Sequence, residues 1–226
     1  MKNLLLILTV LISFSAYSQP IESDYKQFIK ESQITDTRDG KMDIVWWIPT
    51  EFWEIALRRN QDVSEEQITS LIELLKPYTM FAIVKGEMGE FGDYSFIPYE
   101  DFEGKVKAVG ANGKSLKPLS FEDLPVSVQT ILSMIKPILK SALGNMGENM
   151  HFFVFEDKVK KGKRNFDPHL EETIVLNVLD SEYSWEAPFL SLMPPKTCPV
   201  DGEQLSGGWN YCPIHGNELV APEETE

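Results

Sequence analysis

The sequence predicts an α+β fold with a mainly antiparallel sheet, two or three packed helices and a small C-terminal ribbon. Strand-like segments occur in groups, with helical patterns between the groups rather than in strict alternation. The pair Asn112-Gly113 also stands between two short apolar segments, which is a strong signal for a hairpin. Hydrophobic residues make up 42% of the chain and aromatic residues 11%, so a packed core can form without disulfides.

The first 18 residues have the pattern of a secretory signal peptide. Lys2 supplies the positive charge, an apolar run follows, and Ala16 and Ser18 are the small residues before the expected cleavage site. The run is shorter than the roughly 20 residues of a spanning helix, which argues against a membrane anchor. We therefore expect a periplasmic or secreted protein, and no lipoprotein, because no cysteine lies near the cleavage site.

The rest of the chain divides into four segments. We expect an N-terminal arm over residues 19–40, the α+β domain over 41–195, a zinc-ribbon-like appendage over 196–221 and an acidic tail over 222–226. Apolar runs rich in β-branched and aromatic residues predict the strands of the domain. They cover residues 42–48, 79–85, 94–97, 105–109, 115–119, 151–155 and 173–178. We expect the last two to form a hairpin joined by a basic loop.

Helices are predicted from apolar spacing and from capping residues. Ser64 and Gln67 form a capping box before a helix over 65–76. A second helix covers 127–143, with Gly144 placed to end it. Thr50 is expected to cap a third helix through its side-chain oxygen.

The formal net charge of −14 limits the classes of partner. Such an acidic surface repels nucleic acid and anionic lipid, so neither is expected as a ligand. Together with the signal peptide, this charge leaves another protein of the cell envelope as the expected partner, with no membrane-spanning segment in the mature chain.

The only two cysteines begin two similar motifs near the C-terminus. Cys198-Pro-Val-Asp201-Gly is followed by Cys212-Pro-Ile-His215-Gly, with ten residues between Asp201 and Cys212. Two intervening residues let both side chains of each motif reach one ion, and the trailing glycine permits a left-handed turn. The doubled pattern resembles a zinc ribbon in which Asp201 and His215 replace two cysteines. The resemblance implies a structural zinc held by Cys198, Asp201, Cys212 and His215.

Two other interpretations of the motif remain open at this point. Cys198 and Cys212 could form a disulfide that closes a loop of roughly 15 residues, worth about 3 kcal/mol in the chain-entropy model. The segment could also fold without metal, held by Trp209, Tyr211 and Leu219.

The remaining candidates have ordinary structural explanations. The aromatic cluster of residues 46–53 is expected in the core rather than as a ligand platform. Gly86, Gly89 and Gly92 indicate a turn, because the acidic residues among them would repel a phosphate. The basic stretch over 158–164 is expected at a solvated hairpin tip. His151 and His169 stand isolated, and no nucleophile or metalloprotease motif occurs.

The main domain, through residues 48–53 and 143–155, resembles uncharacterised exported bacterial proteins. That resemblance implies a setting in the envelope of a Gram-negative cell and no site residues. We interpret the chain as a non-enzymatic binding or structural envelope protein with a metal-binding ribbon. The alternative is an envelope hydrolase that uses a carboxylate pair which the sequence does not single out.

Overall fold

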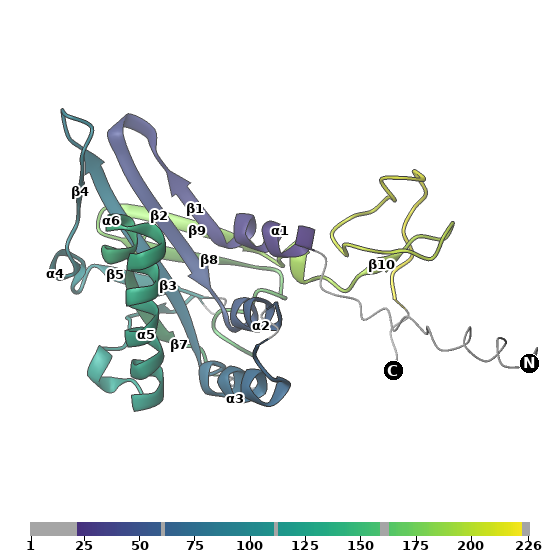
Figure 1. Cartoon of the computed structure of the whole chain (residues 1–226), viewed down its shortest axis with the longest axis horizontal. Helices are drawn as coiled ribbons and strands as arrows, with labels where there is room; N and C mark the ends of the chain where they lie inside the picture. The colour runs from purple at the N-terminus through teal and green to yellow at the C-terminus, as the bar shows by residue number, and fades with distance from the viewer. Residues whose placement is uncertain (1–21, 60–61, 111–112, 159–162, 223–226) are drawn as a thin grey trace, which may run out of the picture.

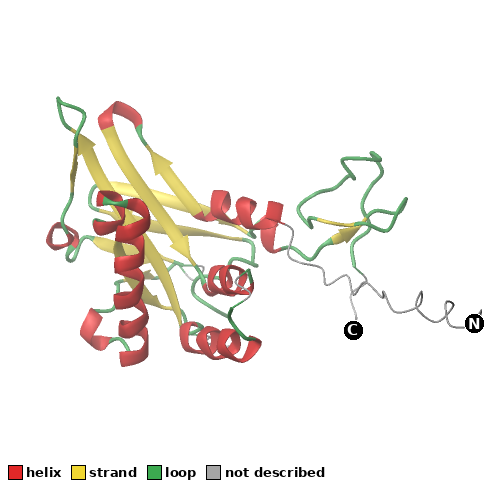
Figure 2. Ribbon diagram, in the orientation of Figure 1, coloured by secondary structure: helices red, strands yellow, loops and turns green. Residues whose placement is uncertain are grey.

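The computed structural model describes residues 22–59, 62–110, 113–158 and 163–222, so the predicted signal peptide lies outside the described residues. Two antiparallel sheets pack face to face, helices cover the outer face of the larger sheet, and the ribbon lies apart from this body (Figures 1 and 2). The α+β prediction is confirmed. The helices are α1 (Glu22–Ser32), α2 (Thr50–Arg58), α3 (Glu65–Leu75), α4 (Tyr99–Phe102), α5 (Val126–Leu143) and α6 (Asn145–Glu148).

The larger sheet has five strands, all antiparallel, in the order β1-β2-β3-β4 with β7 also paired to β3. Its strands are β1 (Gln33–Asp36), β2 (Lys41–Ile48), β3 (Tyr78–Met88), β4 (Tyr94–Phe96) and β7 (His151–Glu156). The glycine-rich segment forms the β3–β4 turn, where Gly89 N–H donates to Asp93 C=O at 2.7 Å. The prediction of a turn is confirmed for Gly89 and Gly92, whereas Gly86 lies within β3 and is paired with β2 and β4.

The smaller sheet has the order β6-β5-β8-β9. Its strands are β5 (Val106–Val109), β6 (Ser115–Leu116), β8 (Glu172–Val178) and β9 (Ser181–Ala187). The predicted hairpin of β7 with β8 is wrong, because β7 pairs with β3 whereas β8 pairs with β5 and β9. The connection between β7 and β8 passes from one sheet to the other. β9 was not predicted, although its buried and exposed residues alternate as a half-buried strand requires.

Large aromatic side chains fill the space between the two sheets. Trp47 of β2 contacts Trp185 of β9 with ring centroids 6.2 Å apart, and Phe81 of β3 lies 5.4 Å from the same ring. The Trp47 indole N–H donates to Thr79 Oγ1 at 2.8 Å, which satisfies the one polar atom of a fully buried ring. The predicted core position of the aromatic cluster therefore holds for Trp47 and for Phe52, which is also buried.

Local sequence signals set the helix ends in two of three cases. The Ser64 and Gln67 capping box is present at α3, and Gly144 ends α5 with φ +60°. At α2 the prediction is wrong, because Pro49 occupies the N-cap and Thr50 is the first helical residue. Thr50 Oγ1 is buried and has no hydrogen-bond partner among the described residues. The fixed φ of proline suits a helix start and displaces the cap by one residue.

The predicted boundary at residue 40 falls inside the larger sheet. β1 pairs with β2 over four positions, from Gln33 with Trp46 to Asp36 with Asp43. The backbone C=O of Ser32 also accepts a hydrogen bond from the buried Trp185 indole at 2.8 Å. The described part of the expected arm therefore belongs to the domain, because its strand supplies an edge of the sheet.

The ribbon follows the 3-10 turn Leu190–Leu192 and is tied to the body beside α1 (Figure 1). The Glu31 carboxylate accepts hydrogen bonds from the N–H groups of Leu190 and Ser191. Gly207 packs so closely on this segment that a Cβ would lie 2.2 Å from Pro194 C=O. Only glycine fits at that contact.

Among the described residues, no helix is long and apolar enough to span the bilayer.

Candidate functional site

The ribbon contains two loops with matching backbone hydrogen bonds, which we call the first and second knuckle. In the first, Gly202 N–H donates to Cys198 C=O at 2.9 Å, and in the second, Gly216 N–H donates to Cys212 C=O at 2.8 Å. Each cysteine N–H in turn donates to the carbonyl of the residue after the glycine, at 2.9 and 2.8 Å. Both glycines have positive φ, +78° and +70°, as the sequence motif predicted.

The two knuckles bring three of the predicted site residues together. The side-chain donor atoms of Cys198, Cys212 and His215 all lie within 4.8 Å of one another, an arrangement that can hold a metal ion. His215 Nδ1 lies 3.4 Å from Cys198 Sγ and 3.5 Å from Cys212 Sγ. The fourth predicted residue, Asp201, places Oδ2 3.7 Å from the same nitrogen. A single imidazole nitrogen thus faces three other donor atoms.

These separations match the edges of a small tetrahedron. Zinc bonds of about 2.3 Å to sulfur and about 2.0 Å to nitrogen and oxygen give edges of about 3.5 Å between sulfur and nitrogen and about 3.3 Å between nitrogen and oxygen. The two sulfur–nitrogen distances fit those edges, whereas Asp201 lies outside the group of donor atoms within 4.8 Å of one another and would have to move towards it to bind the same ion. Asp201 Oδ1 accepts the Glu203 N–H at 3.1 Å, which orients the carboxylate as an outer hydrogen bond orients a metal ligand.

Backbone N–H groups surround both sulfur atoms. Burial raises the pKa of the Cys198 thiol, although the N–H groups of Val200 and Asp201 oppose that effect. Burial also acts on Cys212, but there the N–H groups of His215 and Ile214 outweigh it and lower the pKa of the thiol. Since metal ligands must be thiolates, N–H donors aimed at sulfur favour the form that binds metal.

The ribbon has a small core of its own, separate from that of the body. Cys198, Leu205, Cys212 and Leu219 form it, and all four are buried. Of the three residues expected to hold a metal-free ribbon, only Leu219 is among them, whereas Trp209 is 41% exposed and Tyr211 63% exposed. Both cysteines are free thiols in the structure rather than a disulfide. Such a small core needs a further link between the knuckles.

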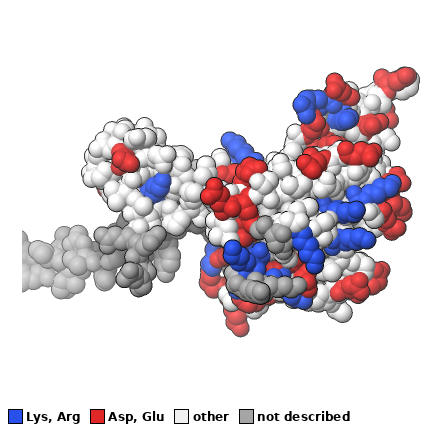
Figure 3. Space-filling model, turned by 180° about the vertical axis from the view of Figure 1, so that it is seen from behind, with Lys and Arg blue, Asp and Glu red and all other residues white. Residues whose placement is uncertain are grey.

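The ribbon surface includes exposed apolar side chains. The space-filling view shows few charged side chains on the ribbon, whereas Lys, Arg, Asp and Glu cover much of the body (Figure 3). Val200 and Ile214 occupy the same position in the two knuckles, and both are more than half exposed, at 54% and 69%. Exposed apolar residues grouped on a small unit are typical of a protein-binding surface.

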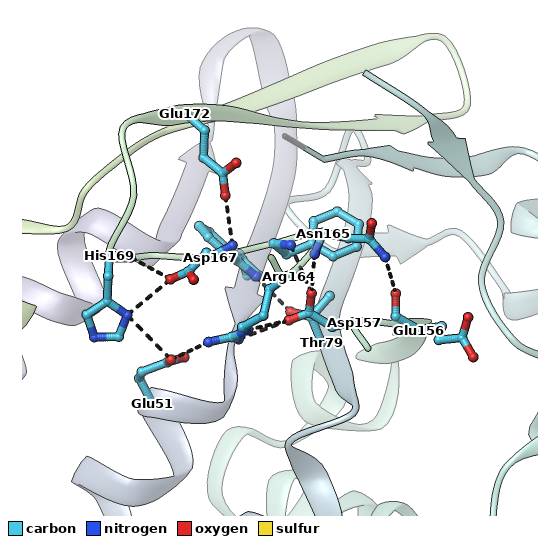
Figure 4. A network of polar contacts seen from close by, with 11 residues as sticks. Glu51, Thr79, Glu156, Asp157, Arg164, Asn165, Asp167, His169 and Glu172 are labelled. Atoms are coloured by element: carbon cyan, nitrogen blue, oxygen red, sulfur yellow. Dashed lines mark hydrogen bonds and ion pairs between the residues drawn. The ribbon is translucent and has the colours of Figure 1, made fainter. Parts of the chain in front are cut away.

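A second cluster of polar residues surrounds Arg164 on the body (Figure 4). The guanidinium pairs with Glu51 of α2 and, at 2.9 Å, with Asp157, and its side chain is only 15% exposed. The expectation of a solvated basic tip is wrong for Arg164, because it neutralises the buried carboxylate of Asp157 and the partly buried carboxylate of Glu51. Lys158 pairs with Glu156 at 2.8 Å, and the lysines at 160 and 161 lie outside the described residues.

Both oxygens of Asp157 are already engaged, whereas Glu51 Oε2 is buried and has no hydrogen-bond partner among the described residues. Asp157 Oδ1 accepts the N–H groups of Asn165 and Phe166 at 2.8 and 2.9 Å, while Oδ2 binds Arg164. Burial raises the pKa of Asp157 to about 6, and Arg164 opposes that rise. His169 belongs to the cluster rather than standing isolated, with Nδ1 3.2 Å from Asp167. The cluster fixes the connection between the sheets onto α2, which is a structural role.

A third buried polar group links the two sheets. Lys85 of β3 pairs with Asp43 of β2 and donates to Tyr183 Oη of β9 at 2.7 Å. Tyr183 Oη donates in turn to Asp43 at 2.9 Å, which closes a triangle. Burial raises the pKa of Tyr183. Burial lowers the pKa of Lys85, but the hydrogen bonds of Lys85 with Asp43 and Tyr183 outweigh that effect, and its pKa is raised. Neither group is poised as a base, so the triangle serves to hold the sheets in register.

The body also has a cavity of about 390 Å³ between β7, α5 and the segment that precedes α5. His151, at the start of β7, lines it and is buried. Its Nε2 lies 3.2 Å from Ile97 C=O. A carbonyl only accepts, so Nε2 carries the proton and Nδ1 keeps a lone pair. This cavity was not predicted, because its walls come from four separate segments of the chain.

We expect His151 to titrate below the ordinary value of 6.5, because burial and the nearby Lys136 lower its pKa. The unfolded chain then binds the proton at higher pH than the folded chain. The stability contributed by neutral His151 is therefore present above pH 6.5 and lost as the pH falls through the folded pKa. An NMR titration of the ring measures the pKa directly, and His151→Gln should weaken the pH dependence of urea unfolding. A ring that titrates at or above 6.5 would contradict this expectation.

No protein-family model matches the chain, and searches of curated proteins and of solved structures find no similar protein. The candidate metal site therefore depends on its own geometry, with no comparison to support or weaken it.

Proposed function

We propose that the chain is an exported, non-enzymatic binding protein whose C-terminal ribbon is held together by structural zinc. The observation that carries this proposal is the approach of Cys198, Cys212 and His215 from two matching knuckles. Zinc accepts thiolate, imidazole and carboxylate ligands in one tetrahedral site. Asp201 is the fourth ligand in this proposal, because its carboxylate lies beside His215 and is oriented by Glu203.

A structural role follows from the number of protein donors. Four protein ligands leave no coordination position for water, which catalytic zinc requires. The metal would instead join two knuckles that share only a small core. Bound in this way, it would present Val200 and Ile214 side by side on a rigid unit for contact with another protein of the envelope.

The runner-up, an envelope hydrolase with a carboxylate pair, has weaker support. Asp157 has the raised pKa of a general acid, but its two oxygens accept hydrogen bonds from two backbone N–H groups and from Arg164. A general acid must be able to reach the substrate. The ion pairs around Arg164 use these carboxylates for folding, so the binding role is the better supported proposal.

Metal analysis of the full chain tests the zinc proposal. The protein is prepared from a bacterial periplasm without chelator or nickel resin and measured by inductively coupled plasma mass spectrometry. We expect about one zinc per chain, and two thiols that react only after a chelator is added. Metal-free protein would overturn the proposal. If the thiols of such metal-free protein react without a chelator, the ribbon folds without metal. If no reactive thiol is found, the two cysteines form a disulfide.

The intact mass of the same preparation tests export. Removal of residues 1–18 is expected to leave a chain that begins at Gln19. A chain that keeps these residues and stays in the cytoplasm of the host would contradict the signal peptide, whatever its metal content.

A further inference from the structure

One edge of β7 has backbone groups that no neighbouring strand pairs. Asp157 N–H donates to Pro77 C=O at 2.7 Å, which shows that the odd-numbered residues of this stretch face β3. In an antiparallel ladder the even-numbered residues then face the opposite side. Two carbonyls on that side are taken, Val154 C=O by Leu119 N–H at 2.8 Å and Glu156 C=O by Asn165 Nδ2 at 3.1 Å.

Phe152 is the remaining position on this edge. Its N–H and C=O, together with the N–H of Val154, form no hydrogen bond with another described residue. Val154 is almost fully buried, so water has little access to its backbone. An unpaired strand edge is a template for another strand, and a buried N–H without a partner favours any ligand that supplies one.

The cavity of about 390 Å³ adjoins this edge and offers an apolar floor. Phe152 and Val154 line it together with side chains of α5, of the segment before α5 and of Met150, which directly precedes β7. These further apolar residues are Leu119, Phe121, Leu124, Leu132 and Met150. His151 lines the same cavity and is only 7% exposed. The lone pair on its Nδ1 accepts no hydrogen bond from a described residue.

The charge around the cavity favours a cation. Glu103 and Glu122 line it, and Lys136 is the one lysine or arginine in the lining. Further carboxylates stand beside them on α4 and on the 3-10 turn Phe121–Asp123, and all are exposed. They are Glu100, Asp101 and Asp123. Within the lining, an incoming group thus meets two carboxylates against one ammonium.

We propose that this cavity and the free edge of β7 bind an extended peptide that carries alternating apolar and basic side chains. The peptide backbone pairs with Phe152, its apolar side chains enter the cavity, and its Lys or Arg side chains lie against the carboxylates. Strand addition of this kind obtains affinity from main-chain hydrogen bonds and specificity from side-chain pockets. The proposal rests on the binding role proposed above, but it uses a different part of the chain from the zinc site.

NMR titration of the full-length, ¹⁵N-labelled protein tests it with the peptide acetyl-Val-Lys-Val-Lys-Val-amide. We expect saturable shifts and slowed hydrogen exchange at the amides of Phe152 and Val154. Two matched peptides serve as controls. Methylation of alternate backbone nitrogens removes the strand pairing, and replacement of both lysines by glutamate reverses the charge. Each control should bind at least about tenfold more weakly, which corresponds to about 1.4 kcal/mol.

Paired variants test the carboxylates without touching the core. Glu103→Lys combined with Glu122→Lys should weaken the basic peptide about tenfold or more and reduce the salt dependence of binding. Glu66→Lys combined with Glu73→Lys, both on the exposed surface of α3, changes the net charge by the same amount and should leave affinity unchanged. The fold of each variant is checked by the dispersion of its amide spectrum.

Three results would overturn the proposal. They are no binding of the basic peptide up to about 1 mM, equal binding of the N-methylated peptide, and shifts confined to residues away from β7. Binding of octylamine with no binding of any peptide would assign the cavity to small apolar amines instead. None of these results bears on the metal content of the ribbon, so failure here and failure of the zinc proposal are separable.

Discussion

Replacement of Arg164 by methionine is expected to lower the free energy of unfolding by about 3 to 5 kcal/mol. The substitution keeps much of the side-chain volume but leaves Glu51 and Asp157 without their cation. Asp157 is fully buried, so water cannot solvate its negative charge once the guanidinium is removed. Urea denaturation at neutral pH, read by the fluorescence of the buried tryptophans, measures the change.

A triple variant distinguishes charge from packing in that result. Arg164→Met with Glu51→Gln and Asp157→Asn removes all three charges, and should recover part of the lost stability. Lys140→Met is the control for an exposed pair, because Lys140 and Glu148 are about half exposed, and it should change stability by no more than about 1 kcal/mol. A loss at Arg164 no larger than at Lys140 would contradict the structural role of the cluster.

The pH dependence of the same variants has a defined sign. Burial raises the pKa of Asp157 to about 6, above the unfolded value, so the folded chain binds the proton more tightly between those two values. The contribution of Asp157 to stability is therefore largest below the unfolded pKa and falls as the pH rises towards 6. Because Arg164 opposes the shift, its removal should raise the pKa further and strengthen this fall.

Signals contained within a short segment predicted the structure well. The capping box of α3, the stop at Gly144 and the two knuckles each depend on residues within six positions of one another. The same is true of the glycine turn between β3 and β4. In these cases local hydrogen bonds and backbone conformation decide the outcome, and both can be inferred from residue types.

Features that depend on distant partners were missed. Arg164 binds Glu51 across 113 residues, and nothing near residues 158–164 indicates that their last member is buried. Strand adjacency misled in the same way, because β7 and β8 follow one another in sequence but belong to different sheets. Pairing in sheets is decided by which faces can be buried together, and that depends on the whole chain.

The ribbon occupies an intermediate position between these cases. The spacing within each motif predicted each knuckle, and the similarity of the two motifs predicted that they meet. The geometry then adds what spacing alone could not provide, the position of His215 Nδ1 between two sulfur atoms and a carboxylate. It also weakens the metal-free interpretation, since Trp209 and Tyr211 lie outside the small core.

Cys212→Ser is expected to abolish metal retention and unfold the ribbon while the body stays folded. Structural zinc in small domains contributes about 10 to 16 kcal/mol of apparent binding free energy, which far exceeds what a core of four side chains can supply. The body has its own core and is joined to the ribbon mainly through one connection. Its unfolding midpoint should therefore change little.

Hydrogen exchange measured by mass spectrometry resolves the two regions in one experiment. In Cys212→Ser we expect rapid exchange throughout residues 196–221 and unchanged protection in β2, β3 and β7. Glu203→Gln is the matched control, because it alters an exposed knuckle carboxylate that is not among the proposed ligands, and it should keep both metal and protection. Asp201→Asn should retain metal more weakly than the unsubstituted chain, since a neutral amide is a poorer zinc ligand than a carboxylate. Protection of the ribbon that survives Cys212→Ser would show that packing alone holds the knuckles together, and the proposed zinc would then have no structural task.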